Sequence, residues 1–153
     1  MKIVIGSDHG GYELKNKILK FLKTKRYKVL DIGTRSKESS DYPLIGFDVA
    51  KKVSEKKADR GVLICKTGVG MAIVANKMRG VRAAACYDKN MARSSREHNN
   101  CNIIVLAAQY SDFKQAKEML RVWLNTKHVG ERHKRRVRQI EEFESKMKKR
   151  GKS

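Results

Sequence analysis

Residues 61–77 read GVLICKTGVGMAIVANK, an apolar run that ends in a cysteine and continues into a glycine-rich turn and a segment of small apolar residues. The run at 61–65 has the length and composition of a buried strand, and the residues after Gly70 have those of a helix. Where a strand leads through such a turn into a helix, backbone N–H groups can bind an anion by donating hydrogen bonds to it. The stretch therefore predicts an α/β fold and a candidate site at Cys65.

Further apolar runs accompany this strand, and stretches of helical period alternate with them. The other runs lie at 2–6, 28–32, 81–86 and 102–106. We expect helices around Leu14–Leu22, after Tyr42-Pro43, after Gly70, and at about 88–96, 112–124 and 131–149. The alternation is typical of βαβ units. We predict a doubly wound three-layer sandwich with a five-stranded parallel sheet and a C-terminal helix.

Length and composition predict one domain. The 153 residues, 40% of them hydrophobic, suffice for a single core, which we place at 1–149 with a basic tail at 150–153. The N-terminal apolar run is too short for a signal peptide or a membrane span, so we expect a cytoplasmic protein.

The three cysteines and the net charge indicate which classes of protein the chain can belong to. Cys65, Cys86 and Cys101 include no CxxC pair, which favours reduced thiols over a disulfide framework or a zinc site. The net charge of +20 suggests a nucleic-acid binder. However, the charge is spread over the chain, and residues 127–153 contain a single aromatic residue, Phe143, for base stacking. We expect steering of small phosphates and no specific nucleic acid.

The last expected helix has a narrow apolar stripe. Val137, Ile140, Phe143 and Met147 follow a 3, 3, 4 spacing. Such a stripe is narrower than that of a core helix. The helix either lies against another subunit or closes the edge of its own sheet.

The carboxyl ends of the strands form the edge at which doubly wound folds bind ligands. Asp8 and His9 follow the first expected strand, and residues 65–70 follow the third. A helix N-terminus and Lys66 beside Cys65 would favour a thiolate. The simpler interpretations are an inert, packed cysteine and an aspartate that only caps a helix.

Two nucleotide-binding motifs begin in this region and fail. Lys66-Thr67 resembles the end of a P-loop, but Arg60 and Cys65 occupy positions where that motif needs glycine. Gly68-Val69-Gly70 begins a dinucleotide fingerprint, whose third glycine is replaced by Ile73. What remains is a turn whose N–H groups can donate hydrogen bonds to an anion.

Two further polar segments carry candidate residues. His98 lies in a fully polar stretch just before the fifth strand, and Arg132 and Arg136 share a helix face, as a phosphate clamp requires. A surface histidine and a solvated basic face are the simpler interpretations.

Taken together, these motifs have a familiar order and spacing over residues 1 to about 145. They are Ser7-Asp8-His9-Gly10-Gly11, Asp41-Tyr42-Pro43, Ile64-Cys65, Thr67-Gly68-Val69-Gly70-Met71, Ala75-Asn76-Lys77, Gly80-Val81-Arg82, Ser95-Arg96-Glu97-His98-Asn99-Asn100, and Arg132-His133 with Arg136. The chain thereby resembles type B ribose-5-phosphate isomerase. The stretch at 96–100 favours this family over the related galactose-6-phosphate isomerase subunits.

The resemblance implies a Rossmann-like fold and an aldose–ketose isomerase of the pentose phosphate pathway, which interconverts ribose 5-phosphate and ribulose 5-phosphate through an enediolate. Cys65 would move a proton between C1 and C2, and His98, aided by Thr67, would open the furanose ring. The substrate-binding residues would be Asp8 and Asn99 at sugar oxygens, the backbone of Lys66, Gly68, Val69 and Gly70 at the enediolate oxygen, and His9, Arg132 and Arg136 at the phosphate.

The resemblance also implies no metal or organic cofactor, and homodimers or dimers of dimers whose sites take residues from two subunits. Two positions depart from the family pattern. Lys66 replaces a small residue, which would strain the turn if the backbone there has positive φ, or would favour the Cys65 thiolate. Ala107-Ala108-Gln109 replaces a Gly-x-Arg pattern. A hexose-6-phosphate (allose or galactose) isomerase and a basic nucleic-acid-binding module are the alternative functions.

Overall fold

One parallel sheet forms the centre of the protein, whose computed structural model describes residues 1–150, with side chains through residue 147. The strands are β1 (Lys2–Ser7), β2 (Lys28–Asp31), β3 (Arg60–Cys65), β4 (Ala83–Cys86) and β5 (Ile103–Ala107). Their order across the sheet is β2-β1-β3-β5-β4, and every neighbouring pair is parallel. The predicted five-stranded sheet is confirmed.

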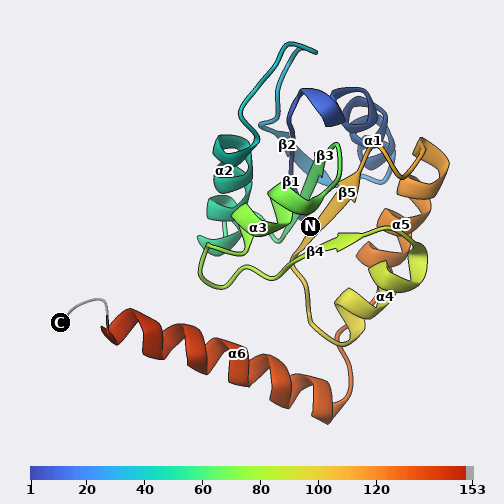
Figure 1. Ribbon diagram of the computed structural model, residues 1–153. Helices are drawn as coiled ribbons and strands as arrows, with labels where there is room; N and C mark the ends of the chain where they lie inside the picture. The colour runs from blue at the N-terminus through green and yellow to red at the C-terminus, as the bar shows by residue number, and fades with distance from the viewer. Residues whose placement is uncertain (151–153) are drawn as a thin grey trace.

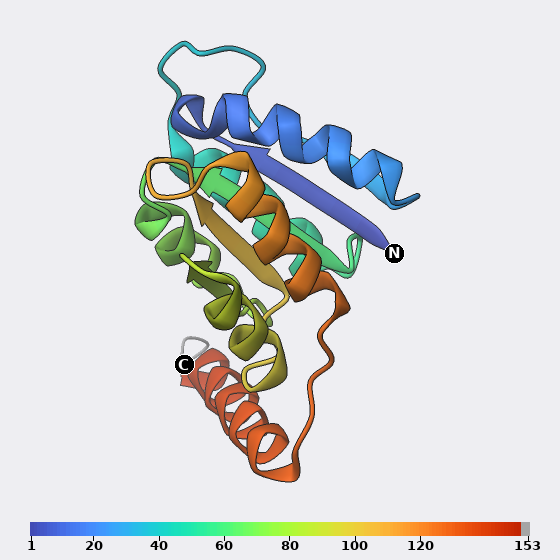
Figure 2. The ribbon, with the colours of Figure 1, turned by 90° about the vertical axis from the view of Figure 1, so that its right-hand side faces the viewer.

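Helices cover both faces of this sheet, as a three-layer sandwich requires. They are α1 (Tyr12–Thr24), α2 (Tyr42–Ser54), α3 (Val69–Ala75), α4 (Lys89–Glu97), α5 (Phe113–Asn125) and α6 (Glu131–Arg150), with a 3-10 turn, η1, at His9–Gly11. In Figure 1, α2 and α3 lie on one face and α1, α4 and α5 on the other. Figure 2 shows the second set in front of the strands, with α6 set apart from both layers.

The core is divided by the sheet into two apolar clusters. Alternate residues of a strand point to opposite faces, so Ile64 packs toward α1 and α5 while Leu63 and Cys65 pack toward α2 and α3. The largest fully buried side chain, Trp123 of α5, lies in the first cluster. The candidate cysteine therefore ends a central strand and faces the α2–α3 layer.

The connections of β1 and β3 leave in opposite directions. From β1 the chain crosses through α1 to the edge strand β2, and from β3 it crosses through α3 toward the far edge strand, β4. Ligands of doubly wound folds bind at such a switch point, where the loops diverge. Here the switch point lies between Ser7 at the end of β1 and Cys65 at the end of β3.

A buried ion pair fixes the chain beyond β2. The side chain of Lys15 is 1% exposed, and its ammonium donates to Asp31 at 2.7 Å and to the carbonyl of Thr34 at 2.9 Å. Removing Asp31, whose own side chain is 28% exposed, leaves the ammonium of Lys15 buried and without its counter-charge, which typically costs about 3–5 kcal/mol. We expect Asp31→Ala to lower the free energy of unfolding by this amount in urea titrations. Lys17→Ala, on the exposed face of α1, should change it by less than about 0.5 kcal/mol, and equal effects would contradict this role.

The C-terminal helix does not close the edge of the sheet. Of the stripe residues, Val137 is buried, whereas Ile140, Phe143 and Met147 are 45%, 67% and 63% exposed. The side of α6 that contacts the body is polar, with Glu144 accepting from the backbone N–H of Gly80. The helix reaches Arg150, and residues 151–153 of the expected basic tail lie outside the described residues. No helix within 1–150 is long and apolar enough to span a membrane.

Candidate active site

Cys65 occupies the carboxyl end of β3, as predicted, and its sulfur is held by the turn that follows. The backbone N–H of Gly68 donates to Sγ at 3.1 Å, the kind of partner that a thiolate accepts. This geometry depends on Gly68, whose φ of +81° is in the left-handed region that favours glycine. The side chain of Cys65 is only 4% exposed, so it is more deeply set than a residue that lines an open cavity.

The turn after Cys65 is fixed from two sides. The hydroxyl of Tyr87 donates to the carbonyl of Thr67 at 3.0 Å, and the hydroxyl of Thr67 accepts from the N–H of Val69 at 3.4 Å. A Cβ on Gly70 would come within 2.7 Å of the Tyr42 ring, so only glycine allows this packing. Backbone N–H groups at the start of α3 are consequently held in one arrangement, which suits the stabilisation of an oxyanion.

Asp8 and His9 face this turn from the end of β1. Asp8 is 7% exposed and accepts from the N–H of Gly11 at 3.2 Å, so the capping role exists, in the 3-10 turn. The Nδ1 atom of His9 accepts from the N–H of Ser40 at 3.2 Å, and the N–H of His9 donates to the Ser40 hydroxyl at 3.1 Å. Since Nδ1 is an acceptor, neutral His9 carries its proton on Nε2 and can donate it to a ligand.

A hollow of about 380 Å³ adjoins His9 on the same edge. Its walls include Gly10, Lys17, Lys37 and the residues that start α5. A second hollow, lined by Thr67, Val69, Tyr87 and Tyr110, lies on the other side of the glycine turn. Cys65 is a lining residue of neither hollow, so in the single chain its sulfur is covered by the residues around it.

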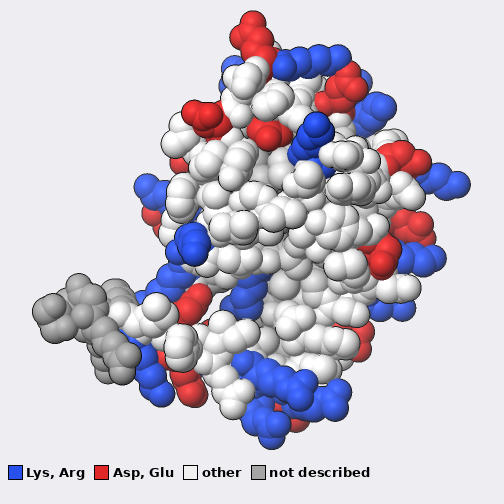
Figure 3. Space-filling view, in the orientation of Figure 1, with Lys and Arg blue, Asp and Glu red and all other residues white. Residues whose placement is uncertain are grey.

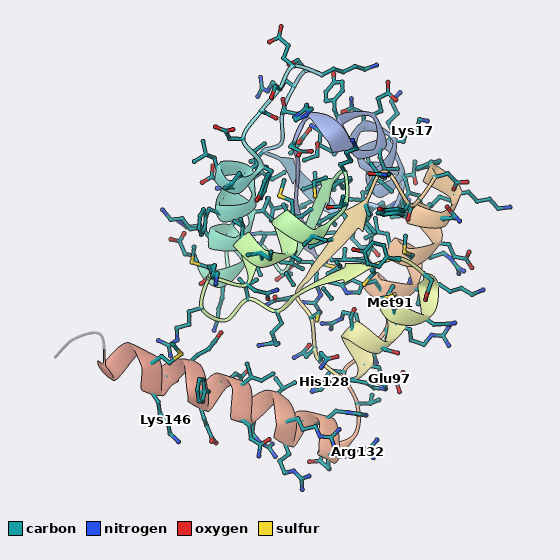
Figure 4. The ribbon with its side chains drawn as sticks, in the orientation of Figure 1. Lys17, Met91, Glu97, His128, Arg132 and Lys146 are labelled. Atoms are coloured by element: carbon teal, nitrogen blue, oxygen red, sulfur yellow. The ribbon has the colours of Figure 1, made fainter. Side chains whose placement is uncertain are left out.

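His98, Arg132 and Arg136 form a separate group. His98 caps the end of α4, and its ring stacks on His133 with centroids 4.2 Å apart and an interplanar angle of 18°. His133 lies in the first turn of α6, next to Arg132. Figure 4 places Glu97, His128 and Arg132 together where α4 ends and α6 begins. The backbone carbonyl of Glu97, at the end of α4, contacts Nδ1 of His128 at 2.9 Å and so holds the segment that leads into α6.

The two groups lie at opposite ends of the strands, one at the carboxyl ends and the other at the amino ends. Residues 98–100 precede the start of β5, whereas Cys65 pairs with Ala107 at its end. The four residue-to-residue steps from Ile103 to Ala107 separate the two ends of β5 by roughly 13 Å. One chain therefore brings Cys65, Thr67, Asp8 and His9 together and leaves His98, Asn99, Arg132 and Arg136 elsewhere.

The stacked imidazole of His133 offers a probe of the second group. Its pKa lies below the ordinary value because of desolvation and the nearby charges of His98, Arg132 and Arg136. At a pH near the ordinary pKa of histidine, the folded protein therefore binds fewer protons at His133 than the unfolded chain does. The free energy of unfolding consequently decreases as the pH is lowered through this range. We expect Arg136→Gln to raise the pKa of His133 in an NMR titration, and Arg121→Gln on α5 to leave it unchanged. An unchanged pKa in Arg136→Gln would place that guanidinium away from the imidazole.

The two departures have different outcomes. The backbone at Lys66 does not have a positive φ, so the prediction of a strained turn is wrong. The non-glycine residues with positive φ are Arg26, Lys56 and Asn100. Its ammonium effect on Cys65 stays a prediction. The N–H of Gln109 donates to the carbonyl of Lys66 at 2.9 Å, so both departures lie side by side at the carboxyl edge.

Sequence reasoning assigned no individual role to three residues that orient the candidate groups. Ser40 fixes the His9 ring, Tyr87 holds the Thr67 carbonyl, and His133 stacks on His98. Only His133 has a local signal, as part of the Arg-His pair at 132–133. Ser40 and Tyr87 act across large sequence separations, which no local pattern encodes.

Comparisons with known proteins find relatives of this chain over nearly its whole length. The family described as Ribose/Galactose Isomerase matches residues 3–140. Ribose-5-phosphate isomerase B of Escherichia coli is 39% identical, over 94% of this chain and 96% of that protein. The structure of ribose-5-phosphate isomerase B from Clostridium thermocellum has a TM-score of 0.93 and 48% identity, covering 96% of this chain and 99% of that one. The Mycoplasma genitalium enzyme with bound ribulose-5-phosphate has a TM-score of 0.91 and 37% identity, covering 94% and 96%.

Proposed function

The chain belongs to the ribose/galactose isomerase family, and we propose that it interconverts ribose 5-phosphate and ribulose 5-phosphate through an enediolate. Relatives named ribose-5-phosphate isomerase B, matched over nearly their whole length, support this activity. A place in the pentose phosphate pathway follows from these two sugars. We propose that residues 1–149 act as one isomerase domain in the cytoplasm, which fits three free cysteine thiols.

The observation that carries the mechanism is the thiol of Cys65 beside the fixed glycine turn. As the base, Cys65 would take the C2 proton of the open-chain aldose and return it to C1, with a second proton moving between the O1 and O2 oxygens. N–H groups of residues 66–70 would face the oxygen that becomes negative in the enediolate. Asp8, at the end of the neighbouring strand, would contact sugar hydroxyls. This chemistry requires no metal or organic cofactor.

Ring opening and phosphate binding would be performed by the second group. His98, with Thr67, would transfer the protons that open the furanose ring, and Asn99 would contact a sugar oxygen. Arg132 and Arg136, one helical turn apart on α6, suit a phosphate. His9 would donate from Nε2 to the same phosphate. Since these residues lie at the other edge of the chain's own sheet, we propose that a second copy supplies them to each site.

Exposed apolar side chains support this homodimer. They gather on the α2–α3 layer and the adjoining edge, and also on α6: Leu44, Phe47, Val69, Ile73, Tyr110, Ile140, Phe143 and Met147. Figure 3 shows few charged side chains in the middle of the face that α3 and β4 occupy. Apolar patches of this kind mark interfaces. A partner docked there would also cover the glycine turn after Cys65 and add walls to the open hollow lined by Thr67, Val69, Tyr87 and Tyr110.

The function is tested by parallel assays of the purified protein with ribose 5-phosphate and allose 6-phosphate. We expect ribulose 5-phosphate to form with the higher kcat/KM. Faster turnover of the hexose phosphate would transfer the assignment to the hexose alternative. Retention of nucleic acid at physiological salt with no isomerisation of either sugar would contradict the enzyme altogether.

A further inference from the structure

A third hollow, of about 440 Å³, lies at the amino edge of the sheet, between the body of the protein and α6. Its walls include Lys56 after α2, Arg60 at the start of β3, Arg82 before β4, and Glu141 of α6. None of these residues belongs to either candidate group. Figure 3 shows Lys and Arg side chains next to acidic ones in the recess beside α6.

Arg60 has most of its hydrogen-bonding capacity free. Within the described residues, its side chain makes one hydrogen bond, from Nη1 to the carbonyl of Asp59 at 2.8 Å. A guanidinium has five N–H donors in a planar fork, which pairs best with an anion. Desolvation lowers the pKa of Arg60, and the charge of Arg82 acts in the same direction against the opposing effect of Asp59. Arg60 is therefore a partly buried cation whose guanidinium has lost part of its hydration, with a second cation, Arg82, nearby.

Arg82 has a weak internal partner. Its Nε donates to the carbonyl of Asn100 at 3.2 Å, and its Nη1 contacts Glu141 at 3.3 Å. Charge-assisted bonds are normally about 2.7–2.9 Å. The Arg82 side chain is 16% exposed, whereas that of Glu141 is 52% exposed. Glu141 therefore approaches Arg82 from the solvent side, where a free anion can replace it.

The second carboxylate of the hollow, that of Asp59, already has a hydrogen-bond partner within the protein. Asp59 accepts from the backbone N–H of Lys2 at 2.7 Å. The Asp59 carboxylate keeps its charge, so Lys56, Arg60 and Arg82 are set against Asp59 and Glu141, a surplus of one positive charge. When an incoming anion displaces Glu141, the surplus becomes two, which fits a phosphate monoester with its charge of about −1.5 to −2 at pH 7.

We propose that this hollow is a second anion site, which binds the phosphate group of a small phosphorylated metabolite between Arg60 and Arg82, in competition with Glu141. Lys56 adds to the attraction from the rim. The volume leaves room for the organic part of the ligand. Asn100, which lines the hollow, follows His98 and Asn99 in sequence, and Glu141 shares α6 with Arg136. An occupant therefore contacts both elements that carry the second group.

The test measures binding of inorganic phosphate, with citrate as the carboxylate arm. The background is Arg132→Ala/Arg136→Ala, which removes the guanidinium groups proposed for the substrate phosphate. Titrations are followed through the backbone amide signals of Gly80 and Asn102, which line this hollow and belong to neither candidate group. We expect saturable shifts with phosphate, and about tenfold weaker binding in the added variant Arg60→Gln, since one bond between charged groups is lost.

Glu141→Gln has the opposite expected effect, because it removes the internal competitor. Phosphate should bind several-fold more tightly, a result that general loss of structure cannot produce. Arg121→Gln, an exposed arginine of α5, is the matched control and should leave the affinity unchanged. Equal affinity in all variants, weaker binding in Glu141→Gln, or a preference for citrate would each overturn the proposal. Isomerase activity does not enter this readout.

Discussion

Cys65→Ala is expected to abolish exchange of the C2 proton while the protein still binds sugar phosphate. Loss of a positioned base typically costs about 10²–10⁴ in rate. The side chain is small and makes one polar contact, to the N–H of Gly68, so its removal leaves the fold and the phosphate-binding residues in place. The measurement is solvent deuterium incorporation at C2 by NMR, with ligand affinity determined by calorimetry.

Cys86→Ala is the matched control for this experiment. Cys86 also ends a strand and is buried, and burial raises the pKa of its thiol to about 12, so it stays protonated at neutral pH. We expect normal deuterium exchange in this variant. Normal exchange in Cys65→Ala, or equal loss in both variants, would remove Cys65 as the base.

Mixing two inactive variants is expected to restore activity if the site is shared. Cys65→Ala and His98→Asn lie in different groups, so in a mixed dimer one site carries both changes and the other carries neither. With random exchange of subunits, half of the dimers are mixed, and about a quarter of the wild-type activity should return. The measurement is ribose 5-phosphate turnover after the two proteins exchange subunits, with mixed dimers detected by native mass spectrometry.

The control is a mixture of Cys65→Ala with Asp8→Asn. Both residues lie at the carboxyl edge of the same chain, so every site of the mixed dimer keeps one defect and no activity should return. Mixed dimers of Cys65→Ala and His98→Asn that remain inactive would mean that His98 acts with Cys65 of its own chain, or not at all.

Much of the fold was predictable because its signals are local. The apolar run that ends at Cys65 and the glycine turn after it are contiguous, and strand and helix periods alternate along the whole chain. All five strands lie within two residues of their expected positions. The edge at which Asp8 and Cys65 meet was also predictable, because parallel strands place their carboxyl ends together.

The stripe on α6 illustrates the limit of such patterns. Periodicity identified an apolar face but left its partner open. Of the stripe, the structure packs only Val137 against the body, because the next residues on the same side of the helix, Glu141 and Glu144, are polar and bind Arg82 and the Gly80 backbone. The exposed remainder of the stripe is the part that we assign to a second copy.

The amino-acid order alone determined the layered α/β architecture, the cysteine at the end of β3 and the turn that follows it, since each depends on neighbours in the chain. Tertiary structure alone decided that His98 and Arg136 lie at the other end of the strands from Cys65. It also decided that Ser40 orients His9 and that Arg60 and Arg82 meet at one hollow. These are contacts between residues far apart in sequence. They arise from the direction in which each strand and helix is packed, and no local spacing specifies them.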